Sequence, residues 1–288
     1  MKFNKIFHKT VLVVLVIYLL LPLAATLIFS IAGKWDHTLL PESITFKWYG
    51  ELFSDERFYQ ALLRSLFLIL VTVAISNIIM LPTIFIVAVY FRRFERILQA
   101  VAMLPYGIPP IVGAVGLIKV YSSGPLQISG TPWLLVGAYF VITMPYMYQG
   151  IRNSLQTINA QELVSAAELL GATKFQAFQK IVVPNILSGI FVSTLLSIAL
   201  LFGEFVLANL LVGGRFETIQ IYLYQKLNKS GHTASAIVIT YYVIILLLTW
   251  IILKLKKRPM QFQSVFGKRK QLILVGEKTK GFLKGEHK

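Results

Sequence analysis

The chain has 288 residues, of which 56% are hydrophobic and 14% are charged, whereas a soluble globular domain is about one quarter charged. This balance excludes an ordinary soluble protein and indicates a polytopic membrane protein. The absence of cysteine excludes a disulfide framework and thiolate chemistry. The formal net charge of +16 does not indicate a nucleic-acid partner, because the basic residues gather at the ends of apolar runs and in the C-terminal tail, as the positive-inside rule describes.

The first half of the chain begins with two long charge-free runs. Residues 1–9 carry three lysines and no acidic residue, and residues 10–33 follow without a charge. A secretory signal peptide starts in the same way, but this apolar run is too long for a signal-peptide core. We therefore predict a first membrane span at 10–33, with residues 1–9 in the cytoplasm. An acidic outer loop with a short interfacial helix at Trp48–Phe53 then leads to a second span at 65–91.

A third span, predicted over 97–118, contains several helix-breaking residues. Pro105, Pro109 and Pro110 lack the N–H groups that a helix needs. Freed backbone groups at membrane depth are tolerated only inside protein or beside a water-filled cavity. We therefore expect this span to line a polar pathway through the membrane, with Tyr106 and Pro109 among the lining residues. A kinked helix that serves only packing is the alternative.

Three further spans are predicted in the second half, at 132–151, 185–212 and 233–253. The outer loop before the last span has more basic than acidic residues, which runs against the positive-inside rule. The charge asymmetries of the flanking segments are stronger, so we keep the topology with both termini in the cytoplasm. The basic tail at 256–288 is expected to be cytoplasmic and attracted to anionic lipid.

Polar side chains within these later spans are candidates for the pathway. Glu204 is the only carboxylate that the predicted spans contain, and Ser193 and Ser197 share its helical face. An acid inside a membrane is a functional hypothesis by default. Glu204, Ser197 and Tyr146 are therefore predicted pathway residues. A place near the outer interface, or a structural pair with an arginine, is the alternative for Glu204.

The loop at 152–184 is the longest charged segment with helical character. Asn159 followed by Glu162 resembles an asparagine variant of a capping box. Gly171 stands where a glycine would end that helix, and Pro184 suits the first turn of the following span. The pattern predicts a helix, a glycine corner, a second helix and then a membrane span.

A second capping box and two apolar faces complete this loop. Thr173 followed by Gln176 predicts that the second helix starts directly after the corner. The apolar faces consist of Leu163, Ala166, Ala167 and Leu170 on the first helix, and Phe175 and Phe178 on the second. Apolar faces on an otherwise polar loop indicate a binding surface for a partner protein. The alternative is that these faces pack only on the rest of the same chain.

The same loop resembles the EAA loop of permease subunits in binding-protein-dependent ABC importers. The family pattern is E-A-A, a short gap, G, nine residues, and I-x-L-P. The positions in register are Ser165, Ala166, Ala167, Gly171, Ile181, Val183 and Pro184. Ser165 replaces the glutamate of the pattern and Val183 replaces its leucine. The membrane layout extends the resemblance to nearly the whole chain.

The resemblance implies an all-α permease of the type I ABC importer fold, with six transmembrane helices over residues 10–255, in the bacterial inner membrane. It further implies a second permease (identical or homologous), two ATPase subunits that bind the ATP, and an extracytoplasmic solute-binding protein. No cofactor is then expected in this chain. In that family the loop sits in a cleft of the ATPase. The coupling residues would be Ser165, Ala166, Ala167, Gly171, Ile181 and Pro184.

The substrate is less defined by the sequence. The segments GEFVLANLLVGG and FETIQIYLY are most similar to permeases of the polyamine group, and tyrosines together with Glu204 suit a small cation. Permeases for phosphonate, iron, sulfate or thiamine share the architecture and remain alternatives.

Other functional classes lack their characteristic residues. The sequence has no G-x-x-x-x-G-K-[ST] phosphate loop and no H-E-x-x-H zinc motif, and its histidines are far apart, so a metal site is not expected. An intramembrane enzyme would need a nucleophile–base pair that the spans do not contain. An ion-coupled secondary transporter is the remaining alternative, but it would need charges in several spans.

Overall fold

The computed structural model describes residues 2–35, 41–123 and 125–255. The chain divides into two units, Met1–Tyr242 and Val243–Lys288, and all contacts discussed below lie within the first. The predicted tail at 256–288 lies outside the described residues. Within the described ranges no strand forms, and only an isolated bridge joins Ala32 to Ile44.

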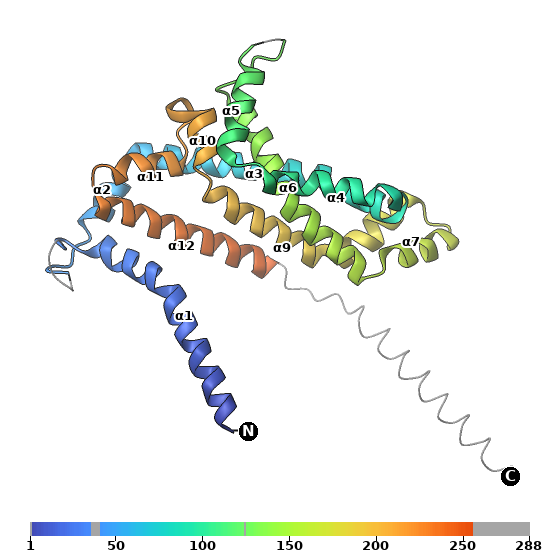
Figure 1. The fold of residues 1–288 in the computed structure, drawn as a ribbon, viewed down its shortest axis with the longest axis horizontal. Helices are drawn as coiled ribbons and strands as arrows, with labels where there is room; N and C mark the ends of the chain where they lie inside the picture. Colours follow the sequence, from blue (N-terminus) through green and yellow to red (C-terminus); the bar gives the residue numbers. More distant parts are fainter. Residues whose placement is uncertain (1, 36–40, 124, 256–288) are drawn as a thin grey trace. The chain divides into compact units, whose positions relative to one another are not determined.

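Helices account for nearly all of the described chain (Figure 1). The α-helices are α1 (Lys2–Ile31), α2 (Lys47–Phe53), α3 (Glu56–Val89), α4 (Glu95–Met103), α5 (Pro110–Tyr121), α6 (Pro132–Thr157), α7 (Ala160–Leu169), α8 (Lys174–Gln176), α9 (Val183–Phe202), α10 (Val206–Leu211), α11 (Ile219–Leu227) and α12 (Gly231–Leu255). Three 3₁₀ turns, η1 (Arg92–Phe94), η2 (Leu104–Gly107) and η4 (Gly213–Phe216), and a π-helical turn, η3 (Ala177–Val182), connect them.

Among the described residues, five helical segments are long and apolar enough to cross a membrane, and a sixth span results if a bent pair counts as one. The bent pair is Arg92–Gly107 with Pro110–Tyr121, whose axes meet at 102°. The break lies where Pro109 and Pro110 remove two consecutive N–H donors. The prediction of an all-α protein with six spans, the third of them broken by prolines, is confirmed.

Two helices differ in extent from the predicted spans. The helix of the second span begins at Glu56, well before residue 65, because Asp55 caps it through the N–H group of Arg57. The predicted fifth span at 185–212 is not one helix. α9 ends at Phe202, and the short helix α10 follows after a break that contains Glu204.

The centre of the bundle consists of α3, α6 and α9, which pack against one another. Small residues allow α6 and α9 to approach closely: a Cβ atom added to Gly189 would lie 2.9 Å from the carbonyl oxygen of Gly150. Polar pairs also join the helices. Ser76 and Thr143 form a 3.1 Å hydrogen bond between α3 and α6, and the Asn77 amide donates to Thr194 on α9 at 3.1 Å.

A second apolar core lies at the end of the bundle that carries α2 and α11. Its buried members are Leu52, Phe58, Ala61, Ile219, Tyr222 and Ile237. α1 joins this end through its last turn: Ser30 bonds the Tyr49 hydroxyl at 2.8 Å, and the Phe29 ring stacks on His232 with ring centroids 4.1 Å apart. Directly after α1, the Ala32 carbonyl accepts from the Trp48 indole N–H at 2.8 Å. The most apolar stretch of α1 is not covered by the rest of the described chain.

Candidate functional site

The corner after α7 is built by backbone hydrogen bonds around Gly171. Gly171 has φ of +88°, a left-handed conformation that favours glycine. Its N–H donates to the Glu168 carbonyl at 3.0 Å, and the Ala172 N–H donates to the Ala167 carbonyl at 3.0 Å. These two bonds are those of a Schellman motif. The prediction that Gly171 ends the first helix of the loop is confirmed.

The second helix of the loop starts at a reciprocal cap. The Thr173 hydroxyl accepts from the Gln176 N–H at 3.2 Å, and the Gln176 side chain accepts from the Thr173 N–H at 3.0 Å. The predicted capping box is therefore present. With the Schellman motif it fixes both sides of the corner by local bonds, and the corner does not depend on long-range packing for its shape.

The predicted cap at Asn159 is wrong. A capping residue has an extended backbone, but Asn159 has φ 48° and ψ 55°, and its side chain makes no capping bond. α6 ends at Thr157 and α7 starts at Ala160, so the chain passes from one helix to the next within two residues. Asparagine tolerates the left-handed conformation that this short connection contains.

Pro184 lies in the first turn of α9, as predicted. No loop separates the second helix of the corner from this span, because residues 174–202 form one continuous helical segment. The π-helical turn η3 lies directly before α9, whose first turn contains Pro184. Proline lacks an N–H and its ring crowds the carbonyl four residues earlier. The wider π turn accommodates both effects, so the corner connects rigidly to α9.

The burial of the loop separates the predicted coupling residues into two groups. Ser165, Ala166 and Gly171 are exposed, whereas Ala167 is buried and Ile181 and Pro184 are half-buried. Three large apolar side chains stand out at the corner itself. Leu169 is 89% exposed, Leu170 is 90% exposed and Phe175 is 69% exposed. Leu169 was missed by the sequence analysis, which followed the helical face of Leu170 only.

The two phenylalanines of the second helix do not share a surface. Phe178 turns inward and packs on Phe85 of α3 with ring centroids 4.7 Å apart. Beside it, the Tyr90 hydroxyl donates to the Glu168 carboxylate at 2.9 Å, and the Lys174 ammonium lies 4.7 Å from the centroid of the Tyr90 ring. Burial, and then the bond to Glu168, raise the pKa of Tyr90 to about 12, so the hydroxyl remains a donor at neutral pH.

The predicted pathway residues of the third and fourth spans lie at the proline break. Tyr106 packs edge-on against Tyr146, with ring centroids 5.9 Å apart and planes at 80°. Pro109 is exposed and lines an apolar groove of about 580 Å³ between α5 and α6. Glycines form part of the groove wall at Gly113, Gly116 and Gly137. The structure thus brings Tyr106 together with Tyr146, at the break that Pro109 helps to form.

Ser197 and Glu204, the other predicted pathway residues, have partners within the chain. Ser197 is fully buried and donates to the Ser193 carbonyl at 2.9 Å. Glu204 lies beyond the end of α9. Its carboxylate accepts from the N–H groups of Leu207 at 2.7 Å and Ala208 at 3.1 Å, so it caps the start of α10. Neither residue lies with the tyrosines of the break.

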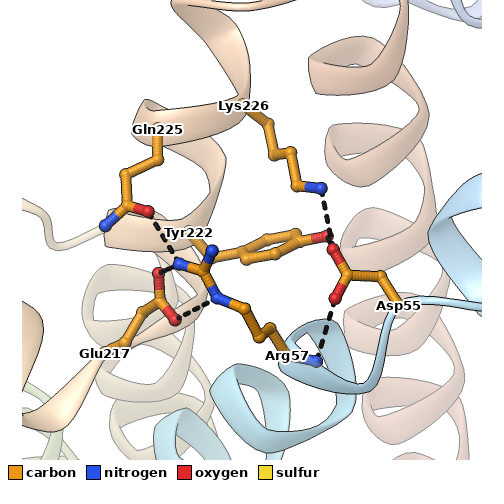
Figure 2. Close-up of polar contacts among 6 residues, drawn as sticks. All are labelled: Asp55, Arg57, Glu217, Tyr222, Gln225 and Lys226. Atoms are coloured by element: carbon orange, nitrogen blue, oxygen red, sulfur yellow. Dashed lines mark hydrogen bonds and ion pairs between the residues drawn. The ribbon is translucent and has the colours of Figure 1, made fainter.

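An ion-pair network that the sequence analysis did not find joins α3 to α11 (Figure 2). Lys226 pairs with Asp55 at 2.7 Å, and Arg57 pairs with Glu217 at 2.7 Å. Tyr222 lies between the pairs and donates to Asp55 at 2.8 Å. Burial acts to raise the pKa of Asp55, but its hydrogen bonds to Lys226 and Tyr222 outweigh burial and hold the pKa below its ordinary value.

Comparison with known proteins identifies the family. Over residues 80–260, more than half of its length, the chain matches the family described as "Binding-protein-dependent transport system inner membrane component". The chain belongs to this family. It is a multi-pass inner-membrane permease subunit of an ABC importer, as the EAA-like loop predicted.

Individual relatives are named for different substrates. The permease is 24% identical over 248 residues to PhnV of Salmonella typhimurium, which is named provisionally for a 2-aminoethylphosphonate transport system; the match covers 85% of this chain and 92% of PhnV. It is 25% identical over 239 residues to the spermidine/putrescine permease protein PotC of Haemophilus influenzae, covering 82% of this chain and 90% of PotC.

Two solved structures share the fold. One is a bacterial ABC transporter that imports the acidic polysaccharide alginate, with a TM-score of 0.65 at 17% identity, covering 88% of this chain and 96% of the other. The second is a bacterial alginate transporter in complex with a periplasmic protein bound to an alginate pentasaccharide, with a TM-score of 0.70 at 19% identity, covering 89% and 96%. The predicted type I importer fold is confirmed.

Proposed function

We propose that this permease forms half of a translocation pathway and couples it to a separate ATPase through the corner of the 152–184 loop. The observation that carries the proposal is the exposure of Leu169, Leu170 and Phe175 on a corner whose backbone is fixed by local bonds. A rigid corner with an apolar tip is suited to enter a groove of another protein.

The energetics of the corner favour a bound partner. Full burial of a leucine or phenylalanine side chain is worth roughly 1.5–3 kcal/mol, so three such residues provide a substantial drive for docking. Ser165, Ala166 and Gly171 are small and exposed beside the tip, which allows a partner backbone to approach closely. Apart from its two chain neighbours, no described residue lies within 4 Å of a Cβ added to Gly171, so the described part of the chain leaves this side of the corner open.

The connections of the corner explain how docking would move the spans. The segment 174–202 runs from the corner into α9 without a break. Phe178 and Glu168 tie the same corner to the end of α3 through Phe85 and Tyr90. A pull on the tip by a closing ATPase pair would therefore move α9 and α3 together, which is the motion that alternating access needs.

The partners in this proposal are those of the family. Two ATPase subunits bind and hydrolyse ATP, a second permease completes the pathway, and an extracytoplasmic solute-binding protein delivers the substrate. The solved alginate ABC transporter is in complex with a periplasmic protein, which supports the last of these partners. The chain itself needs no cofactor in this scheme.

We propose a small amine as the substrate, with a polyamine as the first candidate. The Tyr106–Tyr146 pair at the proline break offers aromatic faces to a cation. Relatives named for spermidine/putrescine and for 2-aminoethylphosphonate support a ligand that carries an amino group. Glu204 and Ser197 have a secondary place in this pathway, because their polar atoms already bond within the chain. A phosphonate is the second candidate.

The test uses cells that lack the native permease and carry a tagged copy or its Gly171→Asp variant. Uptake of labelled putrescine and 2-aminoethylphosphonate is measured together with the amount of permease in the membrane. The Asp side chain should abolish uptake without lowering the amount in the membrane. Gly50→Asp is the matched control, because Gly50 of α2 is exposed and also has open space around it.

Two outcomes separate the parts of the proposal. Normal uptake by Gly171→Asp would refute the coupling role of the corner. Amine uptake that is independent of the permease would refute the proposed substrate and leave the coupling role to be tested by ATPase association.

A further inference from the structure

A polar cavity of about 380 Å³ lies beside α7, the helix that leads into the corner. Its wall is formed by the ends of α3 and α6, by η1 with the first residue of α4, and by the short connection into α7. Val89, Leu155 and Ala160 are buried and supply the apolar part of this wall. The volume is in the range of small-molecule sites. None of the predicted pathway or coupling residues lines the cavity, so it is separate from both proposed roles.

Four charged side chains line the cavity, and two of them neutralise each other. The Arg152 Nε donates to the Glu95 carboxylate at 2.7 Å. Arg92 and Glu162 are the other two. Both are exposed, they do not pair with each other, and neither has an ion-pair partner among the described residues. The cavity therefore presents one free positive charge and one free negative charge.

The polar groups of the wall keep unused hydrogen-bonding capacity. The Arg92 Nε donates to the Ala88 carbonyl at 3.5 Å, and its terminal N–H groups have no partner in the described part of the chain. The side-chain amides of Gln156, Asn159 and Gln161 line the same cavity and make no hydrogen bond within the described ranges. Free guanidinium N–H groups are suited to a carboxylate or a phosphate-like group, and amides can bond to either end of a ligand.

The two free charges select the class of ligand. A ligand with two negative charges would meet the Glu162 carboxylate, and one with two positive charges would meet the Arg92 guanidinium, so each would bring like charges together. A ligand with a single charge would leave one of the two residues without a partner. A small zwitterion can place its anionic group at Arg92 and its ammonium group at Glu162.

We propose that this cavity binds a small zwitterion, such as an amino acid or an aminophosphonate, between Arg92 of η1 and Glu162 of α7. The ligand would restrain α7 against η1 across the two-residue connection that follows α6. Because α7 leads into the corner, the bound ligand would oppose movement of the corner and lower ATP hydrolysis by the complex. This consequence rests on the proposed coupling role, whereas the binding site itself does not.

The first test measures equilibrium binding of labelled 2-aminoethylphosphonate to the importer purified as a complete complex in detergent, without the solute-binding protein. Ethylphosphonate and ethylamine each keep one of the two charges, and should compete about tenfold less well because one charge of the cavity stays unpaired. Arg92→Gln and Glu162→Gln should each weaken binding by about tenfold for the same reason. Arg93→Gln is the matched control and should keep wild-type binding, since Arg93 is exposed on η1 but does not line the cavity.

Exchange of the two charges distinguishes a direct contact from a general structural defect. Arg92→Glu and Glu162→Arg should each abolish measurable binding. The double variant that carries both changes should restore binding, because the zwitterion can then bind in the opposite orientation. A structural defect would not be repaired by a second charge reversal, so binding that stays lost in the double variant contradicts the proposal.

Three other results would overturn the proposal. Ethylphosphonate or ethylamine could bind as tightly as the zwitterion. Binding could be unchanged in both glutamine variants, which would place the ligand elsewhere, for example in the translocation pathway. The wild type could fail to bind the zwitterion while both glutamine variants lose the ATPase during purification, which would assign the cavity to the ATPase contact.

The regulatory consequence is measured as ATP hydrolysis by the same complex. 2-Aminoethylphosphonate should lower the rate of the wild type and leave that of Arg92→Gln unchanged, with each protein compared with its own rate without the ligand. Equal inhibition of both proteins, or binding without any effect on the wild type, would refute regulation through this cavity. Failure of the coupling role itself would appear separately, as normal uptake by Gly171→Asp.

Discussion

Phe178 packs on Phe85 with ring centroids 4.7 Å apart, while Phe175, one helical turn earlier, is 69% exposed. One short helical segment therefore has an inward contact with α3 and an outward apolar side chain at the tip of the corner. In the proposed coupling role, Phe178 would therefore connect the corner to the spans, and Phe175 would contact the ATPase.

Phe175→Ala and Phe178→Ala are predicted to act differently for this reason. Phe175→Ala should leave the midpoint of thermal unfolding unchanged and weaken ATPase association at least tenfold, because it removes only an exposed apolar contact. Phe178→Ala should keep the ATPase but lower uptake and thermal stability, since it leaves a gap against Phe85. Co-purification and thermal unfolding in detergent measure both effects, and identical behaviour of the two variants would contradict the division of tasks.

Gly171→Asn separates two possible requirements at this position. Coupling could depend only on the left-handed backbone conformation, or also on the absence of a side chain. Asparagine tolerates the left-handed conformation, so the corner should keep its shape and the unfolding midpoint should stay within a few degrees of wild type. Uptake should nevertheless fall strongly, because the added side chain occupies the space that the ATPase needs. Full uptake by this variant would show that only the backbone conformation matters.

The corner was predictable from sequence because its structure is decided locally. The Gly171 stop and the Thr173–Gln176 cap involve residues a few positions apart, and each has a residue type suited to its bond. The bend of the third span was predictable for the same reason, since Pro109 and Pro110 act on the adjacent backbone.

Other features depend on the packed helices. The left-handed Asn159 follows from where α6 ends and α7 begins, which the sequence pattern does not show. The Lys226–Asp55 pair joins residues 171 positions apart, so no local spacing indicates it. The exposure of Leu169 beside Leu170 likewise depends on which side of α7 packs inward, a choice that helical spacing leaves open.

Asp55 should give the α3–α11 network a measurable pH dependence. Its pKa is lower in the folded protein than in the unfolded chain, so the ionised form stabilises the fold above the unfolded value of about 3.9. That contribution is lost as the pH falls through the folded pKa. The unfolding midpoint of the wild type should therefore fall more steeply than that of Asp55→Asn between about pH 5 and pH 3. Glu42→Gln, at an exposed carboxylate, should keep the wild-type slope.

Glu204 is predicted to matter mainly as the cap of α10. Glu204→Ala removes both acceptor oxygens, and loss of a helix cap costs about 1 kcal/mol, so thermal stability should fall and uptake of every substrate should fall together. Glu204→Gln keeps one acceptor oxygen and should have a smaller effect. A selective loss of putrescine uptake in Glu204→Gln, with an unchanged unfolding midpoint, would instead place the carboxylate in the substrate pathway.

The most direct measurement of the coupling role is mild-detergent purification of the tagged permease from its native membrane, with the co-purifying proteins identified. The wild type should bring an ABC ATPase and a second permease. A variant with Leu169→Ser, Leu170→Ser and Phe175→Ser should lose the ATPase and keep the second permease, because these side chains form the exposed tip of the corner. A wild-type chain that purifies without an ATPase, or a triple variant that keeps it, would contradict the coupling role of the loop.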